Sequence, residues 1–226
     1  MPSAMIQRLL AVLLLAGLVA LPRTGTAQIT DAIADIELGI KAGVNYTDIQ
    51  SDRVGGDERR RAYVGGGFVE VDLVGPFAVE AELLYSQKGD ETNIGSGASA
   101  SRFKLKLNYL EVPVLLKLQG PLLGNAEANF YAGPAVGVKV SESVEGLSPN
   151  TQVTGTFAKS TDIGAAFGIE FGFGLGDGRF IVDFRFTPGF TEIREDAILQ
   201  AGTDAFEIPA PEASNSTLSV MVGLSL

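Results

Sequence analysis

Hydrophobic and polar residues alternate with a period of two along most of the chain beyond residue 34. In the segment 178–190 the apolar set is Phe180, Val182, Phe184 and Phe186, and the charged set is Arg179, Asp183 and Arg185. Alternation of this kind is typical of β-strands whose two faces meet different surroundings. The pattern predicts eight strands, at residues 35–47, 61–74, 77–88, 102–119, 127–141, 159–175, 178–190 and 214–226.

The connections between these strands alternate in length. The second, fourth and sixth are short, namely Gly75-Pro76, Gly120–Ala126 and Gly176-Asp177. The others are long, at residues 48–60, 89–101, 142–158 and 191–213. Short turns at one end and long loops at the other are typical of outer-membrane barrels, whose short turns are periplasmic. The sequence therefore predicts an all-β fold, an eight-stranded antiparallel up-and-down transmembrane β-barrel.

Two kinds of barrel fit this alternation. In a soluble, lipocalin-like barrel the apolar face points inward, whereas in a membrane barrel it meets lipid and the polar face fills the lumen. Glycines on the polar faces favour the membrane barrel, because a crowded interior needs small residues and a solvated surface does not. They are Gly39, Gly43, Gly133, Gly137, Gly164, Gly168, Gly172 and Gly174.

Aromatic residues near the strand ends also favour a membrane barrel, because such barrels carry an aromatic girdle at each interface. Toward the long loops lie Tyr46, Tyr63, Tyr85, Phe103 and Phe190, and toward the short turns lie Phe77, Phe130, Phe173 and Phe180.

The charges on the polar faces nearly balance. The acids are Glu37, Glu70, Asp72, Glu80, Glu82, Glu111, Glu170 and Asp183, and the bases are Lys41, Lys104, Lys106, Lys117, Lys139, Arg179 and Arg185. A lumen closed to water must pair its charges, because an unpaired buried ion costs several kcal/mol.

In the fourth strand the polar positions change from even (Lys106, Asn108) to odd (Glu111), which predicts a β-bulge near Tyr109 or Leu110.

The first 27 residues have the features of a secretory signal peptide. Arg8 precedes an apolar run from Leu9 to Leu21, and the segment ends in a small-x-small pattern at Ala27. We therefore expect a cleaved signal peptide at 1–27 and an outer-membrane β-barrel domain at 28–226. Cleavage would remove both Arg8 and Arg23 and change the net charge from −10 to −12.

Composition excludes several functions. The 226 residues include no Cys and no His, which excludes disulfides, thiolate nucleophiles, Ser-His-Asp triads and the common zinc sites. With 17 Lys and Arg against 27 acids, the chain has no basic face for nucleic acid. The long loops are acidic, which indicates either simple solvation in a salty habitat or a surface partner or cation.

Two local patterns have a chemical and a structural interpretation. The glycine-rich segment Gly172–Gly178 lacks the Lys-Ser/Thr of a phosphate-binding loop and repeats with period two, which favours lumen-facing glycines. The carboxylates of Glu80 and Glu82 could form a catalytic pair, but lysines on the neighbouring strand favour structural ion pairs. We therefore predict no catalytic, cofactor-binding or metal-binding residues.

Two segments in the middle of the chain resemble a known family. Tyr109-Leu110-Glu111-Val112-Pro113 and the following Val114–Lys117 resemble a strand of the PorT-like outer-membrane β-barrel proteins of Bacteroidetes. Tyr131-Ala132-Gly133-Pro134 resembles the start of the next strand in that family, and Gly39-x-x-x-Gly43-x-Asn45 is also similar. The resemblance implies an eight-stranded outer-membrane barrel and little about activity, although a few relatives assist protein secretion.

The sequence thus predicts a monomeric outer-membrane barrel of a Gram-negative bacterium, surrounded by lipid, with a polar lumen plugged by its own side chains. We expect a structural or surface-interaction role without enzymatic activity or cofactor. Two alternatives stay open: a soluble periplasmic lipocalin-like carrier of an apolar ligand, and an accessory protein of a secretion system.

Overall fold

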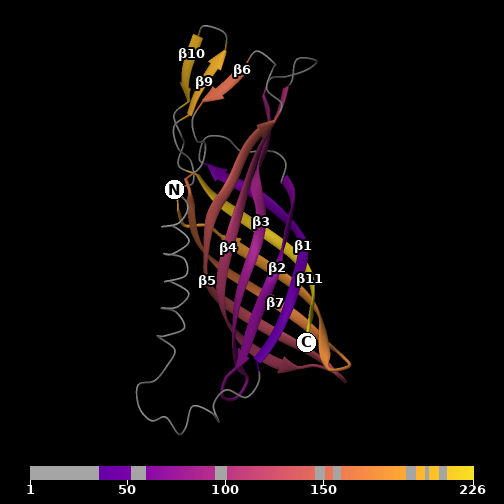
Figure 1. The fold of residues 1–226 in the computed structure, drawn as a ribbon. Helices are drawn as coiled ribbons and strands as arrows, with labels where there is room; N and C mark the ends of the chain where they lie inside the picture. Colours follow the sequence, from indigo (N-terminus) through magenta and orange to yellow (C-terminus); the bar gives the residue numbers. More distant parts are fainter. Residues whose placement is uncertain are drawn as a thin grey trace, which may run out of the picture. The chain divides into compact units, whose positions relative to one another are not determined.

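A computed structural model of the protein describes residues 36–51, 60–94, 101–145, 151–154, 159–191, 197–201, 204–208 and 213–226. Eight antiparallel strands form a closed barrel in the ring order β1-β11-β8-β7-β5-β4-β3-β2 (Figure 1). They are β1 (Ile36–Ser51), β2 (Arg60–Asp72), β3 (Phe77–Ile94), β4 (Ser101–Pro121), β5 (Ala126–Glu145), β7 (Thr161–Leu175), β8 (Gly178–Pro188) and β11 (Ala213–Ser225). The predicted fold class and all eight predicted strands are confirmed.

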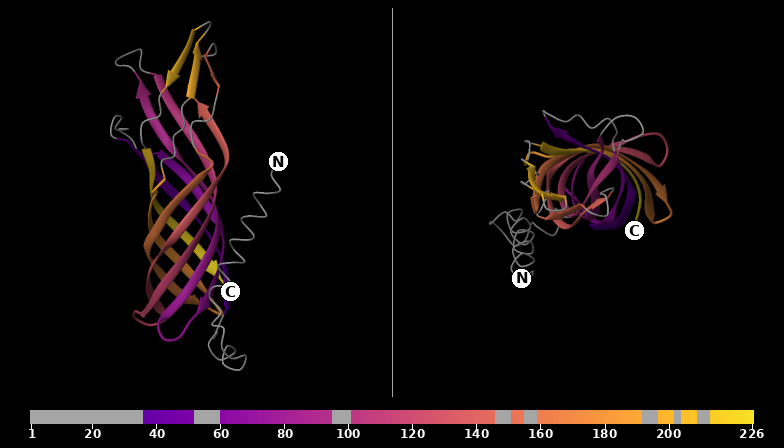
Figure 2. Two further views of the ribbon diagram at one scale, coloured as in Figure 1. Left: turned by 90° about the vertical axis from the view of Figure 1, so that its left-hand side faces the viewer. Right: turned by 90° about the horizontal axis from the view of Figure 1, so that it is seen from above.

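Pairing between β1 and β11 closes the ring, as the view from above shows (Figure 2). The register runs from Gly39 opposite Ser225 to Ser51 opposite Ala213. The first and last barrel strands therefore lie side by side, and the ring has no free edge of the kind that leaves backbone groups unpaired.

The predicted long loops contain more strand than the sequence pattern suggested. β3 continues to Ile94, β4 starts at Ser101 and β5 continues to Glu145. Three short strands, β6 (Thr151–Thr154), β9 (Ala197–Ala201) and β10 (Asp204–Ile208), form a separate sheet in the order β10-β9-β6. These parts escaped prediction because the clean alternation of apolar and polar residues is lost there.

The short connections lie where they were predicted, between β2 and β3, between β4 and β5, and between β7 and β8. Gly75 has φ +74° and Gly176 has φ +64°. This left-handed backbone conformation is open to glycine at no steric cost, so these residues fit tight turns between long strands.

The two faces of the wall are sorted as predicted for a membrane barrel. Along β8, Asp183 and Arg185 are buried inside, whereas Phe180, Phe184 and Phe186 are exposed outside. The exposed aromatic side chains at the short-turn end are Phe77, Phe130, Phe173 and Phe180, and those at the loop end include Tyr63, Tyr85 and Phe190. Phe103 was assigned to the same girdle, but its side chain lies outside the described residues.

Inward-facing glycines let the wall curve tightly. A Cβ atom on Gly133 would lie 1.9 Å from the carbonyl oxygen of Val114, and one on Gly43 would lie 2.1 Å from that of Val220. One on Gly168 would lie 2.2 Å from the hydroxyl of Tyr131, inside the lumen. These positions therefore require glycine, as expected for a crowded interior.

The register shift in the fourth strand occurs where it was predicted, but the extra residue belongs to its neighbour. Asn108 pairs with Ser141 and Tyr109 pairs with Lys139, which leaves Val140 of β5 as the bulged residue. The assignment of the bulge to β4 is therefore wrong.

Because β4 has no bulge, its odd-numbered residues face inward along its whole described length, and near the loop end these residues are apolar. Leu107 and Tyr109 are fully buried, and Lys106 and Asn108 alternate with them on the outer face. The prediction that Lys106 faces the lumen is wrong, and the side chain of Lys104 lies outside the described residues. Polar outward residues are expected where a strand extends beyond the apolar band that meets lipid.

Candidate functional site in the barrel lumen

The centre of the lumen contains three cationic side chains, each bound to several carboxylates. Lys41 Nζ, from β1, lies 2.7 Å from Glu80 Oε1 and 3.1 Å from Glu82 Oε1, both on β3. It also lies 2.8 Å from Glu170 Oε2 on β7 and 3.4 Å from Asp183 Oδ2 on β8. In the ring order β7 is three strands from β1, so this ammonium group joins opposite walls.

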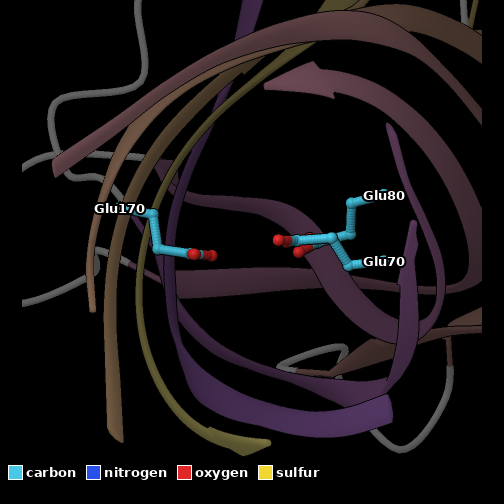
Figure 3. A group of neighbouring side chains, drawn as sticks. All are labelled: Glu70, Glu80 and Glu170. Atoms are coloured by element: carbon cyan, nitrogen blue, oxygen red, sulfur yellow. The ribbon is translucent and has the colours of Figure 1, made fainter. Parts of the chain in front are cut away.

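Lys117 of β4 makes a second set of bonds across the lumen. Its Nζ lies 2.5 Å from Glu70 Oε2, 3.0 Å from Glu80 Oε2 and 2.7 Å from Glu170 Oε1. The three carboxylates approach one another from both sides of the lumen (Figure 3), with one oxygen of each within 4.8 Å of the others. Three convergent carboxylates could hold a metal ion, but here the ammonium group of Lys117 supplies the positive charge.

Arg185 of β8 is the third central cation. Its Nη1 lies 2.5 Å from Glu82 Oε2, and its Nη2 lies 2.8 Å from Glu82 Oε1 and 2.8 Å from Asp183 Oδ2. Arg185 Nε donates to the hydroxyl of Tyr131, which itself donates to Asp183. The forked guanidinium therefore binds one carboxylate through two nitrogens and is held in place by a buried phenol.

Toward the short turns, Arg179 of β8 closes the network. It bonds Glu37 Oε2 at 2.5 Å and Glu70 Oε1 at 3.2 Å, and it also bonds Glu127. Nearby, Gln119 Nε2 donates to Asp72 Oδ1 at 2.9 Å. This end is partly exposed, in contrast to the fully buried centre.

Toward the long loops, Lys88 of β3 forms a smaller cluster. Its Nζ lies 2.5 Å from Glu111 Oε1 on β4 and 3.1 Å from Asp162 Oδ2 on β7. Asp162 also accepts hydrogen bonds from Asn215 Nδ2 at 2.8 Å and from Thr191 Oγ1 at 3.2 Å. The cluster joins four strands and Thr191, which follows β8.

The predicted charged residues of the lumen are largely brought together. Most of the eight acids and seven bases form the contacts above, and Lys139 bonds Glu142 at 2.5 Å. The sequence analysis missed Lys88, Glu127, Asp162 and the phenol of Tyr131. Lys88 has the same parity as Glu80, and Asp162 has the same parity as Glu170, so alternation alone could have found both.

The carboxylates of Glu80 and Glu82 form buried ion pairs in this arrangement. Both carboxylates are fully or almost fully buried and share the ammonium group of Lys41. Their other oxygens bond Lys117 and Arg185 respectively. Because a general acid or base needs access to a substrate, this geometry favours the ion-pair interpretation over a catalytic pair.

The glycine-rich segment Gly172–Gly178 forms the end of β7, a two-residue turn and the start of β8, as expected for lumen-facing glycines.

The outer wall shows where the barrel resides. The outward residues of β3 are apolar from Phe77 to Tyr85, and those of β4 are apolar from Leu110 to Leu118. The two segments lie opposite each other, because Phe77 pairs with Leu118 and Tyr85 pairs with Leu110. Each segment spans nine residues, close to the roughly 9–11 that a tilted strand needs to cross a bilayer. The part of the chain that the structure describes contains no apolar helix of membrane-spanning length.

A family model described as an outer membrane protein beta-barrel domain matches residues 26–195. The chain belongs to this family. Its members are outer-membrane barrels, and this chain is accordingly an outer-membrane protein. The match ends before β11, the strand that closes the ring.

Solved structures with a similar fold include two outer-membrane proteins. A major outer membrane protein from Thermus thermophilus has a TM-score of 0.55 at 10% identity, covering 85% of this chain and 98% of that one. The outer membrane protein OprG from Pseudomonas aeruginosa has a TM-score of 0.51 at 12% identity, covering 86% of this chain and 95% of that one. At such identities the likeness shows the fold alone. A search of curated proteins found no match.

Proposed function

We propose that this protein is an outer-membrane barrel whose lumen is plugged by its own side chains, with a structural or surface-interaction role in the envelope of a Gram-negative bacterium. The observation that carries the proposal is the central ion network. Lys41 and Lys117 each bind carboxylates on opposite walls, and both side chains are fully or almost fully buried. An eight-stranded barrel has an interior that side chains just fill, so such contacts leave no continuous aqueous path.

The absence of enzymatic activity is part of this proposal. It is supported by the lack of His and Cys in the sequence and by the pairing of the buried carboxylates with cations. The alternative of a soluble lipocalin-like carrier is disfavoured, because an apolar ligand needs an apolar interior and most of the buried side chains described here are polar or charged.

Several finer expectations accompany the proposal. The predicted signal peptide at 1–27 lies outside the described residues, and its cleavage would give a mature chain that begins at Gln28. The PorT-like resemblance supports a place among envelope barrels of that group, including the alternative of a secretion accessory. The acidic long loops, whose side chains lie largely outside the described residues, would meet a surface partner or cations, and the barrel would be monomeric.

Conductance in planar bilayers tests the plugged lumen. The purified protein should give no steady ohmic conductance, whereas an open porin measured alongside should give steady channels. Lys41→Gly, which removes a side chain that crosses the lumen, should admit brief current events, and Lys106→Gly on the outer face should not. A steady conductance of porin size in the unaltered protein would refute the proposal.

A further inference from the structure

An interior cavity lies between the central ion network and the Lys88 cluster. Its apolar wall is formed by Val64, Leu84 and Met221, and its polar wall by Thr187, Thr217 and Ser219. Arg185 borders it on the side of the central network, and Lys88 and Glu111 border it on the loop side. We call this cavity the chamber. Its volume of about 10 Å³ holds roughly one water molecule.

The chamber has an incompletely satisfied lining. Thr217 is almost fully buried, and its hydroxyl has no hydrogen-bond partner among the described residues. A buried hydroxyl without a partner is costly, and a small polar molecule in a polar cavity is the usual remedy. The hydroxyl and the cavity together therefore indicate a site for a water-sized polar molecule.

The wall beside the chamber is built differently from the rest of the barrel. Backbone pairing between β2 and β3 runs from Asp72 opposite Ala78 to Val64 opposite Ser86. Beyond Ser86 the ladder of β3 with β4 continues to Ile94, but among the described residues the connections of β3 toward β2 and β1 are made by side chains. Arg60 of β2 donates to the carbonyl oxygens of Lys88 and, at 3.4 Å, Leu105.

Two side chains of β1 bind the same part of β3. Asn45 Nδ2 donates to the carbonyl oxygen of Gln87 at 3.0 Å, and Thr47 Oγ1 donates to that of Gly89 at 2.8 Å. In the ring β2 lies between β1 and β3, and neighbouring strands are about 4.8 Å apart, so these bonds require β3 to lean inward of the start of β2, which still pairs with β1 there. Gly89 has φ +124°, a conformation that favours glycine, at this bend.

We propose that Gln87–Gly89 with its partner segment Leu105–Asn108 is a latched cover over the chamber, which admits small polar molecules from the loop end. The latch consists of the side chains of Asn45, Thr47 and Arg60, together with the ion pairs of Lys88. The two segments keep their backbone ladder to each other and to β5, so only the edge that faces β2 is held by side chains. An edge held by a few side-chain bonds opens locally more often than one held by a continuous backbone ladder. The inference rests on the proposed plugged lumen, since a chamber in an open pore would need no cover.

Cysteine accessibility tests the latch, and the absence of native cysteine makes the measurement clean. Thr217→Cys places a thiol in the chamber, Ser225→Cys places one at a buried position near the short turns, and Asp177→Cys gives the exposed reference. Each is treated in detergent-refolded protein with a charged methanethiosulfonate reagent. In the parent barrel, positions 217 and 225 should react far more slowly than position 177.

Cutting the latch should affect one reporter only. Arg60→Gln should speed the reaction at position 217 by about tenfold or more, since it removes a charge-assisted hydrogen bond from the closed state. It should leave position 225 unchanged. The matched variant Arg179→Gln, at the other end of the lumen, should leave position 217 unchanged.

The outcomes separate the two proposals. If Arg60→Gln changes neither reporter, or raises both equally as in general loosening of the barrel, the latch is refuted and the plugged lumen stands. If both reporters in the parent react as fast as position 177, the plugged lumen fails and the latch fails with it.

Discussion

Neighbouring residues of β8 lie on two faces of the barrel wall that differ in what they require of a side chain. Asp183 and Arg185, on the inner face, bond each other and each has two partners on other strands. Phe184, between them, faces outward. Its ring packs edge-to-face on the ring of Phe171, with 6.4 Å between the ring centroids. The inner face therefore requires particular residues in a particular arrangement, whereas the outer face requires apolar character. Five substitutions, two of them matched controls, test how far this contrast holds.

Lys117→Met should produce the largest loss. It removes the cation shared by Glu70, Glu80 and Glu170 and leaves buried carboxylates without enough positive charge, which we expect to destabilise the barrel by about 3–5 kcal/mol. Denaturant titration of protein refolded into lipid measures the loss. Added Ca²⁺ should recover part of it, because the three vacated carboxylates are spaced to accept a cation. A change below roughly 1 kcal/mol, the value for an exposed pair, would show that the network contributes little.

Phe184→Arg should follow. A cation placed near the middle of the lipid-facing band should cost about 2–4 kcal/mol. Phe184→Leu is the matched control and should cost less than about 1.5 kcal/mol, because lipid does not require a fitted shape. If the two variants were equally damaging, the outer face would be packed against protein and the contrast between the faces would be wrong.

Asp183→Leu, one residue away, should cost about 1.5–3 kcal/mol, since it removes charge-assisted bonds to Arg185 and Lys41. The loss is smaller than for Lys117 because Arg185 keeps both bonds to Glu82. The same denaturant titration applies. A neutral result would place position 183 in water and reverse the assignment of the faces.

Lys106→Met should have the smallest effect, within about 1 kcal/mol, the range of a charge contact outside the lumen. Lys106 lies on the outer face of β4, toward the loop end beyond the apolar band. It is the matched control for Lys117→Met, which makes the same chemical change in the lumen. A loss comparable with that of Lys117→Met would mean that Lys106 belongs to the ion network after all.

Period-two alternation was enough to predict the strands and the face to which most side chains belong. Alternation predicts the face on which a side chain lies but not the residue that it contacts. It therefore indicated that Lys41 and Glu170 both face the lumen, but it could not show that they form an ion pair. The bulge illustrates the limit more closely, because a change of polarity along β4 was interpreted as an extra residue. The change in fact marks where the outer surroundings of β4 cease to be apolar, and the extra residue, Val140, sits on the next strand.

The extended strands were missed for the same reason. Alternation arises only where the two faces of a strand meet different surroundings, and beyond the apolar band both faces can be polar. The end of β3 from Asp90 to Ile94 and the start of β4 from Ser101 to Lys104 therefore carry little pattern. Their pairing is clear only from the backbone ladder, such as Glu91 opposite Lys104.

The ring closure between β1 and β11 has a consequence for how the barrel folds. Lys41 lies on β1, and its partner Asp183 follows it by 142 residues on β8, so their contact forms when β11 pairs with both strands and closes the ring. Contacts between such distant segments form slowly. Until the last strand pairs, the unclosed sheet leaves these charges hydrated, and closure then removes water and forms the ion pairs in the same step. We therefore expect ring closure to be the rate-limiting step of assembly, with the charged residues passing directly from water to their partners.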